Sequence, residues 1–205
     1  EAFVRQAAAD RQIDCHVQSF DTQAYAAEHR LSIEVAAREQ RYRWFEQLAR
    51  ETGCEAIAVA HHQNDQAETV VLNLLRGAGL RGLGGMRPKS ANPVTGNEPP
   101  IIRPLLCTTH EYLVHYLRDI RHLSWVEDST NTDTTIRRNS VRAWLNDRPQ
   151  GEIENICATA AYMQGYADQQ DNQLTRARGL VELYEQLKAY QPKDIEAIYD
   201  AMQRG

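Results

Sequence analysis

The spacing of apolar and polar positions changes along this chain, and the changes predict its elements. Residues 13–20 alternate between apolar and polar side chains, which is typical of a half-buried strand. Residues 33–52 carry apolar side chains at near-helical spacing and predict a long amphipathic helix. Residues 54–60 form a short apolar run, as in a buried parallel strand, and residues 66–75 again have helical spacing. This order predicts an α/β fold with a Rossmann-like parallel sheet covered by flanking helices.

Capping residues give the expected ends of these helices. Ser32 is a typical first residue for the long helix, and Gly53 is a typical stop. Asp65 and Glu68 have the spacing of a capping box, so we expect the second helix to begin at Asp65. Ligands are expected where the sheet's strands end, close to this helix start.

The rest of the chain divides into a loop and a helical tail. Glycines and prolines crowd residues 76–104 and predict a functional or flexible loop without a long regular element. A basic amphipathic helix is expected over residues 136–145. Apolar side chains at helical spacing in the tail then predict a small helical subdomain. We therefore expect two units, residues 1–148 and 149–205.

Composition and charge narrow the class of protein. The 205 residues include 42% hydrophobic and 25% charged side chains, and no apolar run approaches the roughly 20 residues that span a bilayer. The net charge is −5, but residues 1–149 carry 18 basic and 19 acidic side chains, so most of the excess acidity lies in the tail. The four cysteines are widely spaced, which favours reduced thiols in a cytoplasmic protein. From the first residues we expect no secretory leader. The sequence leaves open whether the protein forms a homodimer.

Two imidazoles and two carboxylates lie where the apolar strand gives way to a helix. His61, His62, Asp65 and Glu68 stand in the run His-His-Gln-Asn-Asp-Gln-Ala-Glu-Thr. One interpretation is purely structural, with Asp65 and Glu68 capping the helix. In the other, the carboxylates face a bound ammonium group or a hydrated Mg²⁺ ion. A zinc site is disfavoured because no cysteine accompanies the histidines.

Five glycines follow that helix, between residues 77 and 85. The simplest interpretation is a helix cap and a flexible turn, and the alternative is close approach of the backbone to a ligand. The loop does not join a strand to a helix, which excludes a dinucleotide-binding fingerprint and a Walker loop. From Arg76 to Arg103 there are five basic residues and a single acidic one. This segment either binds phosphates or an RNA backbone, or is simply a basic loop exposed to solvent.

Taken in order, several motifs resemble the tRNA-isoleucine-lysidine synthetase family. The run from His61 to Thr69 is followed by Arg-Gly-Ala-Gly-Leu-Arg-Gly-Leu at residues 76–83. Leu-Ser-Ile-Glu at residues 31–34, Ile-Arg-Pro-Leu-Leu at 102–106 and Arg-Asn-Ser-Val-Arg at 138–142 agree in order and spacing. The resemblance covers about residues 1–145.

This resemblance implies a PP-loop ATP pyrophosphatase that uses ATP and Mg²⁺. Such an enzyme joins L-lysine to the wobble cytidine of a CAU-anticodon isoleucine tRNA and forms lysidine through an adenylated cytidine. Members of the family carry Ser-Gly-Gly-x-Asp-Ser near the N-terminus, and this sequence contains no such motif. We therefore expect the first strand, the ATP loop and the second strand to precede residue 1, and the chain by itself to bind ATP weakly and to be inactive.

The resemblance also assigns roles to residues. It implies catalytic roles for His62, Asp65 and Glu68, with the two carboxylates holding the lysine ammonium. The expected lysine and cytidine pocket comprises His61, Arg76, Gly77, Gly79, Arg81 and Gly82. Arg138, Asn139 and Arg142 would either bind the tRNA backbone or pair with Asp128 and hold the loop. Asp128 and Asn131 belong to the same set of tRNA-binding or structural residues.

Two other functions stay open at this point. A tRNA thiolation enzyme of the same superfamily shares a similar His-His motif, but such enzymes typically need paired cysteines, which are absent here. A non-catalytic tRNA-binding fragment is the other alternative. It is favoured by the absence of the ATP-loop motif.

Overall fold

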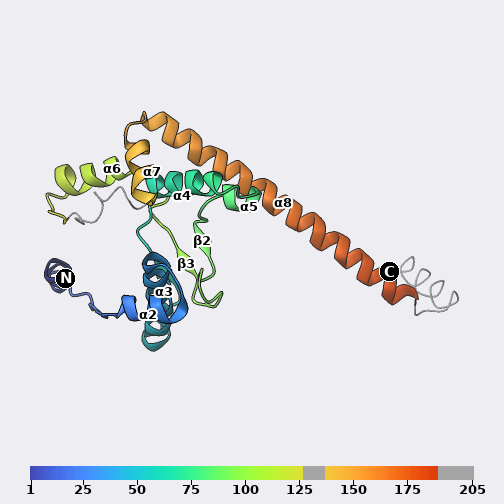
Figure 1. Ribbon diagram of the computed structural model, residues 1–205, viewed down its shortest axis with the longest axis horizontal. Coiled ribbons are helices and arrows are strands. Elements are labelled where there is room, and N and C mark those ends of the chain that lie inside the picture. The colour runs from blue at the N-terminus through green and yellow to red at the C-terminus, as the bar shows by residue number, and fades with distance from the viewer. Residues whose placement is uncertain (127–136, 189–205) are drawn as a thin grey trace, which may run out of the picture.

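The computed structural model describes residues 1–126 and 137–188, which form two groups of helices joined by strands (Figure 1). The first group comprises α2 (Thr22–His29) and α3 (Ile33–Thr52), whereas α1 (Ala2–Ala9) lies apart from them at the other end of an extended segment. The second comprises α4 (Gln63–Leu75), α5 (Leu80–Leu83), α7 (Arg137–Asn146) and α8 (Gln150–Lys188). Between them run β1 (Ile57–Ala58), β2 (Lys89–Ser90) and β3 (Ile101–Ile102). Helix α6 (His110–His115) continues into a π-helical turn, η1 (Tyr116–Ile120).

Helix α3 has the ends that its sequence predicts. The hydroxyl of Ser32 accepts a hydrogen bond from the backbone N–H of Val35 and so caps the first turn. Gly53 ends the helix in the left-handed conformation with φ of 71°, which a residue with a side chain adopts at a cost. This long helix packs against α2 and brings its arginines towards the end of β1.

The three strands form one small sheet with the order β1-β3-β2. Strands β1 and β3 are parallel, with Ile57 opposite Ile101, whereas β2 and β3 are antiparallel. Ile101 in the central strand is fully buried. The α/β class is confirmed, and the parallel pair is present, but the antiparallel β2 was not predicted.

Two expectations about the strands were wrong. Residues 13–20 form no strand, and Ile13 and Val17 are exposed, because no strand of the described sheet pairs with this stretch, although part of it lies beside α3. In residues 54–60 only Ile57 and Ala58 are strand, and they are half-buried or exposed rather than buried. Residues 76–104 contain no long regular element, as expected, but they include the short α5, β2 and β3, because β3 pairs with β1 across a long stretch of sequence.

A buried core joins α4, α7 and the first part of α8. Its members are apolar side chains from all three helices: Ala67, Leu72, Val141, Leu145 and Ile153. The beginning of α8 therefore packs as part of the second group of helices. The division of the chain after residue 148 stays a prediction about domains.

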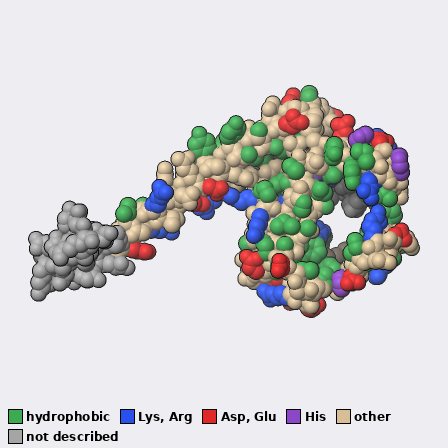
Figure 2. Space-filling model, turned by 180° about the vertical axis from the view of Figure 1, so that it is seen from behind, with side chains coloured by type: hydrophobic (Ala, Val, Ile, Leu, Met, Phe, Trp, Pro, Cys, Tyr) green, Lys and Arg blue, Asp and Glu red, His purple; other side chains and the backbone are tan. Residues whose placement is uncertain are grey.

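Helix α8 extends well past the rest of the described molecule. Its 39 residues span roughly 58 Å at the rise of an α-helix. Its first half lies along α4 and α5, and its second half projects away from them (Figures 1 and 2). Neither α8 nor any other helix within residues 1–126 and 137–188 is both long and apolar enough to cross a membrane.

Candidate active site

The start of α4 lies where the chain leaves β1 and crosses towards the segment after β3. The backbone N–H of Val59 donates to the carbonyl of Ile102, and the N–H of Gln63 donates to the carbonyl of Thr108. These two bonds hold residues 59–63 against the segment that follows β3. His61 and His62 are thereby fixed at the carboxyl end of a parallel strand, the expected position for a ligand site.

The predicted start of α4 was wrong, since the helix begins about one turn earlier than expected. His62, not Asp65, is the N-cap, and Asp65 is the third helical residue. The Oδ2 atom of Asp65 accepts a hydrogen bond of 3.0 Å from the backbone N–H of His62. The Asp-x-x-Glu spacing was also compatible with a helix that begins after Asp65. The hydrogen bond from the N–H of Gln63 to the carbonyl of Thr108 fixes the earlier start at Gln63. Glu68 is therefore free of any capping role.

Glu68 instead lies at the centre of an acid–arginine cluster formed by Asp65, Glu68, Arg138 and Arg142. Its side chain is 3% exposed and accepts bonds from the Nε atoms of Arg138 at 2.8 Å and Arg142 at 2.6 Å. Arg142 also donates from Nη2 at 3.2 Å, so its contact is bidentate, and this hydrogen bonding raises the pKa of Arg142. The Oδ1 atom of Asp65 lies 3.5 Å from Nη2 of Arg138. Two guanidinium groups thus balance one buried and one half-buried carboxylate.

Neither role that the sequence offered for Arg138 and Arg142 included these contacts with the carboxylates of α4. Both arginines come from α7 and turn towards the first turns of α4. Asn139 on the same helix is buried. Asp128 and Asn131 lie outside the described residues, so the expected pairing with Asp128 stays untested. The assignment of Glu68 to the lysine ammonium also stays a prediction, although the two arginines already occupy its oxygens.

His61 and His62 stand beside this cluster as neutral imidazoles. Burial lowers the pKa of both histidines, and the nearby carboxylate of Asp65 opposes that shift only in part. The Nε2 atom of His62 lies 3.4 Å from Oδ2 of Asp65, and its ring centroid is 5.4 Å from that of His110. The Nδ1 atoms of both histidines are buried and have no hydrogen-bond partner among the described residues. Neutral rings of this kind are able to accept a proton at neutral pH.

A basic cavity of about 480 Å³ opens at this end of β1. Its lining includes Arg38 and Arg41 from α3, Arg138 from the acid–arginine cluster and His61, against one carboxylate, Glu34. Aromatic rings lie in the same wall: Tyr42 and Phe45. The volume is within the range of small-molecule sites, roughly 300 to 1,000 Å³. Three arginines and two rings suit a ligand that combines phosphates with a flat base.

The glycine-rich loop, residues 76–86, lies along the other side of α4. Arg76 ends that helix, and Gly77 and Gly79 follow it, so this part of the loop is roughly 16 Å along the helix axis from Asp65. Gly82 is held by the side chain of Asn73, which donates to its carbonyl at 2.7 Å. The structure therefore does not bring these glycines beside the acid–arginine cluster.

The end of the same loop returns towards the start of α4. Met86 bonds to the side chain of Gln66, which directly follows Asp65 in the sequence. Arg81 instead pairs with Asp171 of α8. Sequence reasoning did not single out Gln66 or Asn73, and the one available signal was the position of Gln66 inside the His61–Thr69 motif.

The described side chains do not fit a Mg²⁺ site. Within the described residues no three His, Cys, Asp or Glu side chains lie close enough to hold an ion together. Asp65 and Glu68, the carboxylates that the sequence offered, already face Arg138 and Arg142. Mg²⁺ stays a prediction tied to ATP itself, and no step is assigned to it.

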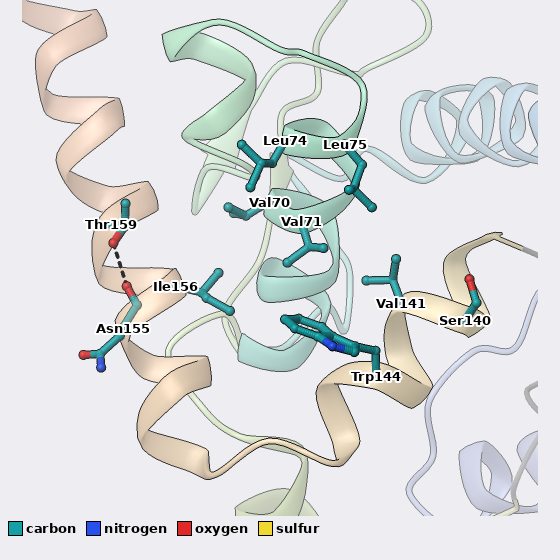
Figure 3. Close-up of a pocket in the computed structure, with 10 residues that line it drawn as sticks. All are labelled: Val70, Val71, Leu74, Leu75, Ser140, Val141, Trp144, Asn155, Ile156 and Thr159. Carbon is teal, nitrogen blue, oxygen red and sulfur yellow. Dashed lines mark hydrogen bonds between the residues drawn. The ribbon is translucent and has the colours of Figure 1, made fainter.

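A second cavity, of about 680 Å³, is an apolar groove between α4, α7 and α8 (Figure 3). Val70, Val71 and Leu74 of α4 face Trp144 of α7 and Ile156 of α8 across it. None of its lining side chains is titratable. The groove therefore supplies no acid, base or charge for a reaction, which leaves the basic cavity and the acid–arginine cluster as the candidate site.

A comparison with protein families decides the relationship of this chain. A family model described as a PP-loop domain matches residues 1–148. The chain belongs to this PP-loop family. The match includes every residue of the basic cavity and of the acid–arginine cluster.

Individual relatives of this PP-loop chain share a single name, tRNA(Ile)-lysidine synthase. The protein of Porphyromonas gingivalis is 48% identical over 141 residues, which is 69% of this chain and 29% of the relative. That of Bacteroides thetaiotaomicron is 46% identical over 142 residues, 69% of this chain and 31% of the relative. That of Chlorobaculum tepidum is 43% identical over 142 residues, 69% of this chain and 40% of the relative. The PP-loop chain thus spans well under half the length of the curated relatives it matches.

Proposed function

We propose that this PP-loop protein joins L-lysine to the wobble cytidine of a CAU-anticodon isoleucine tRNA at the expense of ATP, forming lysidine. The observation that carries the proposal is the placement of the basic cavity directly beside His61 and the acid–arginine cluster, at the carboxyl end of β1. The shared name of the relatives supports the choice of substrates. ATP use also accords with the PP-loop family.

The basic cavity is the proposed site of the adenylate. In the first step the cytosine O2 atom attacks the α-phosphate of ATP and releases pyrophosphate. Negative charge grows on the phosphate oxygens in that step, and Arg38, Arg41 and Arg138 lie where they can stabilise it. Tyr42 and Phe45 offer flat surfaces for a base.

The neutral histidines are the proposed proton acceptors of the second step. The lysine ε-amine must lose a proton before or while it attacks C2 of the cytidine and displaces AMP. Burial lowers the pKa of His62, so its imidazole is neutral and available at pH 7. Asp65, with its side chain 15% exposed, would attract the incoming ammonium.

Glu68 has a different role in this proposal from the one that its motif suggests. Its buried carboxylate holds the guanidinium groups of Arg138 and Arg142 in place. Arg138 lines the basic cavity, so Glu68 acts on the adenylate site through that arginine. We therefore assign the lysine ammonium to Asp65 and the orientation of Arg138 to Glu68.

The partners belong to the same proposal. Lysine, ATP and the isoleucine tRNA are its substrates, and a cytoplasmic location follows from where tRNA is modified. The thiolation alternative gains no support from the cysteines. All four are free thiols, and burial raises the pKa of Cys157 to about 11, which makes it a poor nucleophile.

The test is transfer of labelled lysine to unmodified CAU-anticodon tRNA by the complete protein in which this sequence occurs. We expect ATP-dependent transfer, and a loss of roughly 100-fold or more in kcat/KM for Asp65→Asn. Glu55→Gln is the matched control, since Glu55 is exposed and has the same change of charge. Binding of tRNA without transfer would favour a non-catalytic protein, and ATP-dependent incorporation of sulfur would favour a thiolation enzyme.

A further inference from the structure

The end of the glycine-rich loop is held by a buried amide of α4. Gln66 is 6% exposed. Its Nε2 atom donates to the carbonyl oxygens of Met86 at 3.1 Å and Gly84 at 3.3 Å. Its Oε1 atom accepts the backbone N–H of Met86 at 2.7 Å. One side chain thus satisfies both the donor and an acceptor of the same loop residue.

A second amide reaches the same two carbonyl groups from α8. The Nε2 atom of Gln164 donates to the carbonyl of Met86 at 3.0 Å and also to that of Gly84. Gln66 and Gln164 are far apart in the sequence and come from different helices. We call these two side chains the amide pair.

The loop backbone comes so close to the amide pair that two glycines are required. A Cβ atom on Gly84 would lie 2.7 Å from Cγ of Gln164. A Cβ atom on Gly85 would lie 2.7 Å from Oε1 of Gln66, and Gly85 also has a positive φ of 64°. At these positions glycine therefore allows the loop backbone to approach the two amide side chains, and flexibility is not its main role.

Two ion pairs attach the flanks of the same segment to α8. Arg81 pairs with Asp171, and Arg87 pairs with Asp168 through both of its terminal nitrogens. All four side chains are well exposed, and such pairs contribute little to stability. The amide pair, with Gln66 buried and Gln164 half-buried, therefore carries most of the constraint on the loop.

From these contacts we propose that Gln66 and Gln164 are positioning residues that fix the glycine-rich loop against the start of α4, so that α8 helps to shape the substrate pocket. Gln66 directly follows Asp65 in the sequence, and its side chain binds Gly84 and Met86 of the loop. The proposal rests on the proposed function in one respect. It takes the loop to form the pocket for lysine and cytidine.

The test compares Gln164→Glu and Gln164→Met with the same changes at Gln170 in the complete protein. Gln170 lies on the same helix and is exposed. Glutamate and methionine both lack the N–H groups that bind the two carbonyl oxygens. Hydrogen exchange measured by mass spectrometry over residues 80–90 should accelerate roughly tenfold for the Gln164 variants and stay unchanged for the Gln170 variants.

Kinetics separate positioning from a loss of folded enzyme. We expect KM for lysine to rise roughly tenfold in the Gln164 variants, with KM for ATP unchanged because the basic cavity is lined by other residues. A lower kcat with both KM values unchanged indicates a structural role only and overturns the proposal. Unchanged exchange over residues 80–90 overturns it as well.

The two proposals fail in different ways. If the wild-type protein transfers no lysine, the proposed function fails, and the assignment of this loop to a lysine pocket fails with it. Hydrogen exchange then still decides whether the amide pair holds the loop.

Discussion

Helix α4 is held on two sides by contacts of opposite character. On one side, the acid–arginine cluster joins Asp65 and Glu68 to α7 through full charges. On the other, Gln66 and Gln164 hold the glycine-rich loop through neutral amides. Charged groups respond to pH and to charged ligands, whereas amides fix a shape with little dependence on either. The difference suggests that the cluster serves the chemistry and the amide pair serves the geometry of the pocket.

The largest effect is expected from Glu68→Ala, which leaves Arg138 and Arg142 without their shared carboxylate. Removing one partner of a buried charge pair costs about 3 to 5 kcal/mol. We expect a loss of stability near the lower end of that range, because the two arginines keep 30% and 29% of their side-chain surface exposed. Urea denaturation of Glu68→Ala and of the exposed control Glu55→Ala measures the difference. Equal stabilities would show that the cluster is not formed in solution.

A smaller loss is expected from Gln66→Ala on the other side of α4. The backbone groups of Gly84 and Met86 lose part of their hydrogen bonding, at about 1 to 3 kcal/mol. Since no full charge is involved, the loss should be the same at low and high salt, in contrast to that of Glu68→Ala. Denaturation at two salt concentrations, with Gln173→Ala on the exposed part of α8 as control, tests this distinction. A strong salt dependence would contradict it.

The smallest effect concerns pH and the two histidines. The folded state lowers the pKa of His61 and His62 below the ordinary 6.5, so the unfolded chain binds more protons once the pH falls below about 6.5. Stability is therefore unaffected by these groups above that pH and declines as the pH falls through 6.5 towards the folded values. The double variant His61→Asn, His62→Asn should lose less stability between pH 7 and pH 5.5 than the wild type. Thermal midpoints measured across that range provide the check, and parallel curves would refute the expectation.

Local sequence signals predicted those parts of the fold that depend on neighbours along the chain. The cap at Ser32 and the stop at Gly53 are fixed by hydrogen bonds within three or four residues, and both were predicted. Strand formation depends on partners, and here the predictions failed. Residues 13–20 have strand-like alternation but pair with no strand of the described sheet, whereas Ile101 and Ile102 lie in a loop-like region and form the central strand.

The sequence predicted which residues belong to the candidate site, but not which of them contact one another. The motif containing His62, Asp65 and Glu68 drew attention to the start of α4, and the resemblance added Arg138 and Arg142. That Glu68 binds both arginines is not visible in the sequence, because about 70 residues separate them. Gln164 was missed for the same reason, and a glutamine in an amphipathic helix gives no signal of its own.

The sequence by itself determined the family of this protein, the helix ends and the residue types available for its chemistry, because these depend on short stretches with their own spacing. The tertiary structure decided which groups meet. It paired the carboxylates of α4 with the arginines of α7, and it placed an amide of α8 on the glycine-rich loop. Such contacts arise from packing helices that are distant in sequence, where burial sets the strength of a charge pair or hydrogen bond and the pattern along the chain does not.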